Sequence, residues 1–199
     1  MQHTKVYPEG SFTVYNQKPS YKNIIFSTQT HSNIVLTYPH FTRETIGDGI
    51  IISYTELQDR LLAVKTADCL PILYLGKTHL ALIHAGWRGV ENGILINAKL
   101  KELEVHSIYI GPAISEEAFE VQDDFCSNFP DSDFFSNHGN KIHFNLIKEA
   151  TSRIQKAFPH ARIDCANICT YSTDGLHSFR ENGTDQRNWN IFKLNKDKL

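Results

Sequence analysis

The sequence predicts an α/β fold, a layered sandwich with mixed β-sheets flanked by helices. Segments with strand character clearly outnumber those with helical periodicity. The two clear helical patterns each lie between strands, and several closely spaced strand pairs require antiparallel hairpins. The hairpin at residues 70–84 is apolar on both faces, which is typical of a sheet covered on both sides. One face carries Leu73, Leu80 and Leu82, and the other carries Leu70, Ile72, Ala81 and Ile83.

Each element follows from a local pattern. Short runs rich in β-branched and aromatic residues predict strands at 11–15, 23–27, 34–38, 50–52 and 61–65. After the hairpin, an apolar stripe predicts a helix over residues 90–104. Asn145 is a good N-cap for a second helix that ends before Pro159. The remaining expectations are strands at 106–110, 119–121, 163–171, 176–180 and 189–194, a brief helix at 123–129, and an exposed loop at 131–140.

Length and composition exclude several classes of protein. The 199 residues are expected to form one domain, 1–199, with a sizeable core. The net charge of −2 gives no basic footprint for nucleic acid. We find no apolar run of membrane-spanning length and no signal-peptide pattern in the first residues, so a cytoplasmic location is expected. The four cysteines are interpreted as free thiols, and a monomer is assumed.

The central hairpin places a thiol beside an imidazole. Gly76-Lys77 has the glycine that a two-residue II′ turn prefers, and this turn would put Cys69 directly opposite His84. Opposed residues have Cβ atoms roughly 4.5–5.5 Å apart. Pro71 could disturb the pairing before it reaches Cys69, because it has no backbone N–H. Cys69 and His84 are therefore the first candidates for chemistry.

Two kinds of chemistry remain open for this pair. In the first, Cys69 and His84 bind zinc together with His31, which lies in the polar segment Gln29-Thr-His-Ser-Asn33 ahead of a strand. Three protein ligands would leave a fourth position open, as in catalytic zinc sites. In the second, Cys69 is a nucleophile that His84 activates, as in cysteine hydrolases. The same thiolate does not readily perform both roles.

Further candidates surround the pair. Gly86-Trp-Arg-Gly89 leads into the predicted helix, so Arg88, Gly89 and the helix N-terminus are interpreted as a phosphate site. Asp68 could orient a histidine ligand through a hydrogen bond. Asp48, in a Gly-Asp-Gly turn, and Arg180 are weaker candidates for substrate or phosphate contacts. Each of these patterns also has a purely structural explanation. The glycines could belong to a close-packed turn, the aspartate to a strand end, and the arginines to the solvent-exposed surface.

Several motifs occur in the order in which they are found in the YfiH family, also described as polyphenol oxidases, laccase-domain proteins and peptidoglycan editing factors. They are Gln29-Thr-His31, Thr66-Ala-Asp-Cys-Leu-Pro71, His84-Ala-Gly-Trp-Arg-Gly89, Gly111-Pro-Ala-Ile114, Phe119-Glu-Val121, Cys169-Thr-Tyr171 and Phe179-Arg180. The resemblance extends over roughly residues 24–194. It implies β-sheet layers flanked by helices, as in cytotoxic necrotizing factor-like folds, and zinc ligands at His31, Cys69 and His84.

The resemblance also implies an activity that residue patterns alone do not specify. Family members convert adenosine, inosine, guanosine and methylthioadenosine, with phosphate, to free base and ribose 1-phosphate, and they also deaminate adenosine. On this basis Cys69, His84, Asp68 and Arg88 are expected to be catalytic. Arg88, Gly89, Asp48 and Arg180 are expected to bind phosphate or substrate.

The chain departs from the family pattern near its start. The Arg-x-Gly-Gly-Val-Ser type segment that usually precedes the first ligand is not found between Met1 and Asn23, so a shortened N-terminal segment is expected, and with it a possible loss of activity. The alternatives are a Cys–His hydrolase that edits peptidoglycan precursors, a copper-dependent polyphenol oxidase and a non-catalytic metal-binding module. Copper is less expected than zinc, because laccase chemistry needs several coppers and the sequence has no paired His-x-His motifs.

Overall fold

A six-stranded mixed sheet forms the middle layer of the fold. The computed structural model describes residues 2–195, and the remaining ends of the expected domain, Met1 and residues 196–199, lie outside the described part. In order across the sheet, the strands are β13 (Arg162–Cys165), β9 (Ser107–Ile110), β7 (Leu70–Leu75), β8 (His79–Ala85), β5 (Gly49–Ser53) and β4 (Val35–Thr37). Strands β7 and β8 lie at its centre, as the apolar hairpin predicts.

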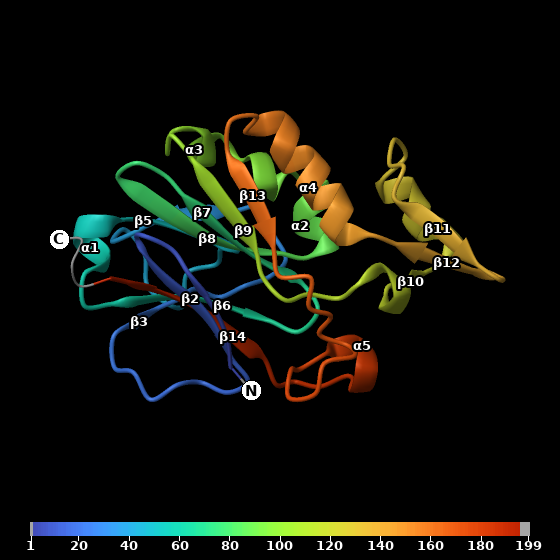
Figure 1. The fold of residues 1–199 in the computed structure, drawn as a ribbon, viewed down its shortest axis with the longest axis horizontal. Coiled ribbons are helices and arrows are strands. Elements are labelled where there is room, and N and C mark those ends of the chain that lie inside the picture. The colour runs from blue at the N-terminus through green and yellow to red at the C-terminus, as the bar shows by residue number, and fades with distance from the viewer. Residues whose placement is uncertain (1, 196–199) are drawn as a thin grey trace.

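A second sheet covers one face of the first, and helices cover the other (Figure 1). The second sheet has the order β1 (Gln2–Val6), β2 (Gly10–Tyr15), β14 (Asn188–Leu194), β6 (Leu61–Thr66) and β3 (Ile24–Ile25). The helical side holds α2 (Trp87–Glu91), the 3₁₀ turn η1 (Ile94–Ile96), α3 (Ala98–Lys101) and α4 (Leu146–Ala157). The predicted α/β sandwich of mixed sheets and flanking helices is confirmed.

The two faces of the central hairpin belong to two different cores. Leu70, Ile72, Ala81 and Ile83 pack in the core under the helices. The opposite face packs against the second sheet through Leu73, Leu75, Leu80 and Leu82, where it meets Phe12, Val64 and Phe192. This division confirms the prediction, and it explains why the hairpin lacks the polar alternation of a half-exposed sheet.

The remaining elements lie at the edges. A small three-stranded sheet, β10 (Glu120–Val121), β12 (Lys141–Phe144) and β11 (Phe135–His138), projects at the right of Figure 1. The short helices α1 (Tyr54–Leu57), η2 (Glu116–Ala118), η3 (Asp123–Asn128) and α5 (Phe179–Asn182) connect the strands. No helix within residues 2–195 has the length and the apolar character needed to cross a membrane.

Four predicted elements are wrong. The helix expected over 90–104 begins earlier, at Trp87, and is broken at Gly93, which has a left-handed φ of 81°. The loop expected at 131–140 contains β11.

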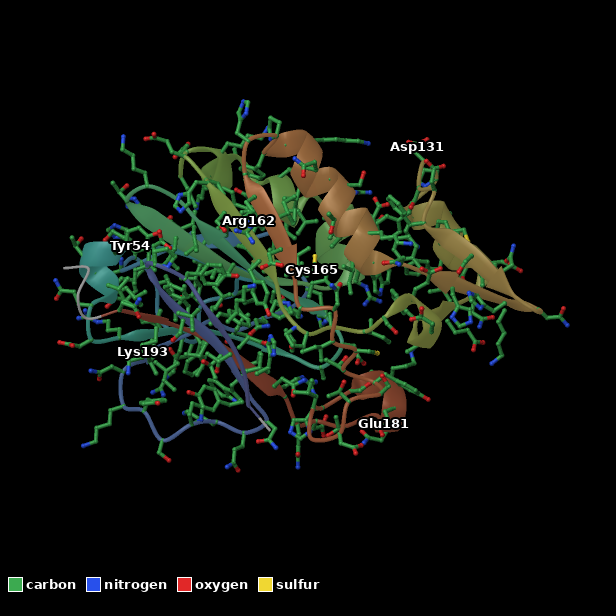
Figure 2. The ribbon with its side chains drawn as sticks, in the orientation of Figure 1. Tyr54, Asp131, Arg162, Cys165, Glu181 and Lys193 are labelled. Atoms are coloured by element: carbon green, nitrogen blue, oxygen red, sulfur yellow. The ribbon has the colours of Figure 1, made fainter. Side chains whose placement is uncertain are left out.

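At the C-terminal side, the strand expected over 163–171 ends at Cys165, which is labelled in Figure 2 and is partly buried against the core under the helices. The strand expected at 176–180 is replaced by a loop and α5, whose N-cap Ser178 accepts a hydrogen bond from the Glu181 N–H. Strand β1 and helix α1 were not expected.

Candidate metal centre and adjoining cavity

The structure brings the three predicted ligands together from distant parts of the chain. His31 lies in the loop between β3 and β4, Cys69 immediately precedes β7, and His84 lies near the end of β8. One donor atom from each residue lies within 4.8 Å of the other two. The imidazole rings of His31 and His84 have centroids 4.8 Å apart and meet edge to face.

The register that places Cys69 beside His84 differs from the predicted one. Pro71 is opposite His84, and the Gly76 N–H donates to the His79 carbonyl, so that the turn residues are Lys77 and Thr78. The predicted direct opposition of Cys69 and His84 is therefore wrong. Both registers keep the two side chains on the same face, so they are diagonal neighbours and still within reach of each other.

Two glycines near the hairpin are required by space rather than by turn geometry. A Cβ at Gly76 would lie 2.0 Å from the Leu103 carbonyl oxygen, which explains this glycine without a II′ turn. A Cβ at Gly86 would lie 2.7 Å from Cδ2 of His31 and 3.0 Å from Sγ of Cys69. Gly86 has an ordinary φ of −74°, so its role is to leave room where the ligands meet.

Asp48 holds the ligand-bearing segments in place. It is fully buried, and its carboxylate accepts hydrogen bonds from the backbone N–H groups of Thr30, His31 and Ser32 and from the Ser32 hydroxyl. It also accepts a bond of 2.7 Å from Nδ1 of His84. Since a carboxylate only accepts, Nδ1 of His84 carries the proton and Nε2 remains available as a ligand. Asp48 also supports His31 in its left-handed conformation, with a φ of 62°.

The charges of this group stabilise one another. Burial opposes ionisation of the Cys69 thiol, but the charge of His84 and hydrogen bonds from His31 and His84 prevail and lower its pKa to about 6. For His84, burial opposes protonation, but the Cys69 thiolate and Asp48 raise the pKa to about 9. For Asp48, burial is outweighed by hydrogen bonds from His84 and Ser32, which lower the pKa to about 2. We call His31, Cys69, His84 and Asp48 the ligand corner.

Asp68 has a different position from the one expected. Its Oδ1 accepts a bond of 2.7 Å from the Thr170 hydroxyl, and its Oδ2 accepts one of 2.7 Å from the Arg180 backbone N–H. The carboxylate that orients a histidine ligand is thus Asp48, and Asp68 instead ties the start of α5 to the segment that carries Cys69. The expectation that Asp68 orients a histidine is wrong, because its two oxygens bond Thr170 and Arg180.

A cavity of about 620 Å³ adjoins the ligand corner. His31, Cys69, His84 and Asp68 contribute to its wall. Its apolar lining consists of Ala67, Trp87, Ile114, Phe119, Leu146 and Phe179, and its cationic lining consists of Lys65, Arg88, Arg180 and Arg187. We call these four cationic residues the cationic rim. A volume in the range of about 300–1,000 Å³, with an apolar lining and a few convergent polar groups, is typical of small-molecule sites.

The cations of the rim contact carbonyls and aromatic rings. Arg88 lies over the Trp87 ring at 4.3 Å, and Arg180 lies over Phe119 at 5.4 Å and donates to the Glu120 carbonyl. Within residues 2–195, the rim takes part in no ion pair. Its positive charge is therefore available to an anionic ligand.

The other predicted site residues are divided between the cavity and the interior. Arg88 and Arg180 reach the cavity, whereas Asp48 and Gly89 do not line it. Gly89 is buried, and a Cβ there would lie 3.1 Å from the Ser32 carbonyl oxygen. Helix α2 has only five residues, so its dipole adds little at the cavity. The contribution of this segment is the side chain of Arg88.

Sequence reasoning missed several residues of the cavity. Lys65, Arg187 and Phe179 lie at its wall, although no candidate role was given to them. Gln29 was noted only as part of a motif, yet its side-chain amide bonds both the N–H and the carbonyl of Lys65, at 2.8 and 2.7 Å. Lys65 and Arg187 stand at strand ends, which is the signal that could have identified them.

The donor set fits a transition metal. Two imidazoles and one low-pKa thiol are the nitrogen and sulfur ligands that zinc and copper prefer. In a tetrahedral zinc centre the ligand atoms lie about 3.5 Å apart, and the three donors here lie within 4.8 Å of one another. The three residues therefore fit a divalent metal with a further coordination position for a ligand, and the donor set suits both metals.

Comparison with known proteins connects this geometry to a group of relatives. A family described as multi-copper polyphenol oxidoreductase laccase matches residues 13–194. The chain is similar to a purine nucleoside phosphorylase of Clostridium acetobutylicum, with 28% identity over 88% of this chain and 79% of the relative. It is also similar to purine nucleoside phosphorylase YfiH of Escherichia coli, with 32% identity over 68% of this chain and 60% of the relative.

The matched share differs among the other relatives and the solved structures. A Haemophilus influenzae purine nucleoside phosphorylase is 35% identical over 53% of this chain, which spans 44% of that relative. Among solved structures, a Neisseria meningitidis protein has a TM-score of 0.74 and 28% identity, covering 87% of this chain and 75% of its own. YlmD of Geobacillus stearothermophilus, at 22% identity and a TM-score of 0.74, shares the fold.

Proposed function

Because the chain belongs to the YfiH family of laccase-domain proteins, we propose that it is a metal-dependent purine nucleoside phosphorylase. It would cleave the glycosidic bond of adenosine, inosine, guanosine or methylthioadenosine with inorganic phosphate, giving free base and ribose 1-phosphate. The observation that carries the proposal is the convergence of His31, Cys69 and His84 on a cavity with aromatic and cationic walls. Relatives of this chain bear the name purine nucleoside phosphorylase.

The proposal gives each part of the cavity a task. His31, Cys69 and His84 would hold zinc, which when bound supplies a Lewis acid at an open coordination position. Asp48 keeps His84 in the tautomer that directs Nε2 toward the cavity. Arg88 is the proposed phosphate ligand, since its guanidinium is exposed beside the cavity and has no ion-pair partner among residues 2–195. Trp87, Phe119 and Phe179 offer rings on which a purine can stack.

The test is incubation of the purified protein with adenosine or inosine, with and without phosphate, followed by chromatography of the products. Release of base only when phosphate is present supports phosphorolysis. Conversion of adenosine to inosine in the same assay supports the deaminase activity. Removal of metal with a chelator and re-addition of zinc or copper identifies the metal that restores turnover. Turnover of no nucleoside under any of these conditions would reject the proposal.

A second candidate is favoured by one observation. Cys69 lies beside His84, which donates a hydrogen bond to Asp48, and the thiol has a lowered pKa, as in Cys–His hydrolases. Such an enzyme, acting on peptidoglycan precursors, would be inactivated by iodoacetamide and would be indifferent to chelators. A multi-copper oxidase is less well supported, because residues 2–195 contain one cluster of three or more metal-binding side chains, whereas laccase chemistry uses several coppers.

A further inference from the structure

Lys65 is fixed at the wall of the cavity. It lies on β6 opposite Trp189 of β14, and Gln29 bonds its backbone on the other side. Its Nζ lies 5.4 Å from the ring centre of Phe26 and 5.9 Å from that of Trp189. Its ammonium group therefore lies in a partly buried position against two aromatic rings, which contact each other edge to face.

Arg187 brings a second positive charge to the wall of the same cavity. It directly precedes β14, and its Nη1 donates to the carbonyls of Thr184 and Gln186 at 2.7 and 2.8 Å. Within residues 2–195, its Nε and Nη2 groups donate to no other residue. Burial lowers the pKa of Lys65, and repulsion from Arg187 and Lys18 lowers it further.

The protein leaves this pair of charges without compensation. In the part of the chain that the structure describes, neither Lys65 nor Arg187 forms an ion pair. Asp68 is the acidic residue of the cavity lining, and its two oxygens are occupied by Thr170 and Arg180. Two like charges in a partly buried position are unfavourable unless an anion binds between them.

This position is distinct from that of Arg88. Lys65 lies on β6 and Arg187 directly precedes β14, two neighbouring strands of the second sheet, whereas Arg88 belongs to α2 on the helical side of the other sheet. Both positions line the same cavity. A neutral nucleoside with one orthophosphate would need only one of them.

We infer that Lys65 and Arg187 form a second anion subsite, which binds a phosphate group carried by the nucleoside, so that the cavity accepts purine nucleoside monophosphates. The inference rests on the proposed function for the purine part of the ligand. It goes beyond that function in naming a phosphorylated substrate class and two specificity-determining residues. The anion at this subsite is a phosphate monoester, and the free orthophosphate of the reaction binds separately at Arg88.

Calorimetric titration of the metal-containing protein with AMP, adenosine and inorganic phosphate tests the inference. We expect AMP to bind at least about tenfold more tightly than adenosine at low salt, because a charged contact to phosphate is desolvated in the cavity. Lys65→Gln and Arg187→Gln are each expected to remove about tenfold of the AMP affinity, and to leave the affinities for adenosine and orthophosphate unchanged. Lys65→Arg, which retains the charge, is expected to restore most of the AMP affinity.

A matched control is Lys22→Gln, which removes an exposed lysine that lies outside the large cavity. It is expected to leave all three affinities unchanged, and thermal unfolding of each variant verifies the fold. The inference is overturned if AMP binds no more tightly than adenosine, or if Lys65→Gln weakens orthophosphate binding as much as AMP binding. Nucleoside turnover is measured separately, so tight AMP binding without phosphorolysis would reject the proposed function alone.

Discussion

The ligand corner and the cationic rim lie at the same cavity but are held in opposite ways. In the ligand corner, the buried Asp48 accepts hydrogen bonds from the His31 segment and from His84, which is almost fully buried. In the rim, Arg88 and Arg180 are exposed, and their charges contact rings and carbonyls. The corner is therefore rigid before anything binds, whereas the rim has a charge imbalance that a ligand would correct.

The largest effect should come from removing a ligand in the corner. Cys69→Ser is expected to abolish metal binding and to reduce phosphorolysis by about 10³-fold or more, because a Lewis acid contributes several kcal/mol to the transition state. Metal content and kcat/KM provide the measurements. Cys126→Ser, at a thiol outside the cavity lining, is the control and should retain both. Full activity in a metal-free Cys69→Ser variant would contradict the proposed role of the corner.

The charge pair in the corner predicts a pH dependence in metal-free protein. The lowered pKa of Cys69 gives stability that is lost as the pH falls toward 6, and the raised pKa of His84 gives stability that is lost as the pH rises toward 9. Iodoacetamide should therefore alkylate Cys69 with a midpoint near pH 6, whereas an ordinary thiol has a pKa of 9.0. The rate is measured by mass spectrometry of the modified peptide. A midpoint near the ordinary value would show that the pair is not formed.

Asp48→Asn should separate positioning from ligation. The amide cannot accept from all the donors around it, so metal affinity is expected to fall about 10–100-fold and the free energy of unfolding to fall by about 2–4 kcal/mol. The same variant should raise the midpoint of Cys69 alkylation, because His84 loses the partner that keeps it protonated. Asp164→Asn, which removes a carboxylate that pairs with Lys5, is the control with unchanged metal affinity.

Substitutions in the cationic rim should have smaller effects than those in the ligand corner, and these effects should appear in the KM for phosphate. Arg88→Gln is expected to raise the KM for phosphate about tenfold with little change in metal content, because one charged contact is lost. Initial rates at varied phosphate concentrations give this value. An unchanged KM for phosphate would assign that anion to another residue of the rim.

The smallest effect is expected at Phe179, whose side chain is 58% exposed at the cavity. Phe179→Ala should change the free energy of unfolding by no more than about 0.5 kcal/mol. If the ring stacks on the purine, the variant should raise the KM for the nucleoside several-fold and leave the KM for phosphate unchanged. Equal increases in both constants would instead indicate a general disturbance of α5. This helix contains Glu181, which is labelled in Figure 2.

The same contrast explains what the sequence could predict. The corner was found because its ligands stand beside apolar strands, whose pattern locates Cys69 and His84 on one face of the sheet. The precise register was missed, because Gly76 was interpreted as a turn residue. In the structure, a glycine is needed there because the Leu103 carbonyl lies against its α-carbon and leaves no room for a side chain. Asp48 and Asp68 could not be assigned from spacing, because their partners at His84, Thr170 and Arg180 are joined only by tertiary structure.

Two of the four rim residues, Lys65 and Arg187, were missed for a related reason. Lys65 lies near a strand end, and Arg187 comes from the segment between β13 and β14, where the expected strands at 163–171 and 176–180 were wrong. Isolated lysines and arginines have no periodicity, and their solvent-exposed positions are the usual ones. The uncompensated charge of Lys65 and Arg187 becomes visible only when the surrounding carboxylates are located in three dimensions.

Gly86 offers a way to recognise related chains whose metal binding is impaired. The hydrogen atom on its α-carbon is all that fits between the imidazole of His31 and the sulfur of Cys69. A methyl group there would collide with the His31 ring and the Cys69 sulfur, although every donor would still be present in the sequence. A homologue that keeps both histidines and the cysteine but carries a larger residue after the His-Ala pair is thus expected to bind the metal more weakly, although a search based on the donors alone would count it as a metal site.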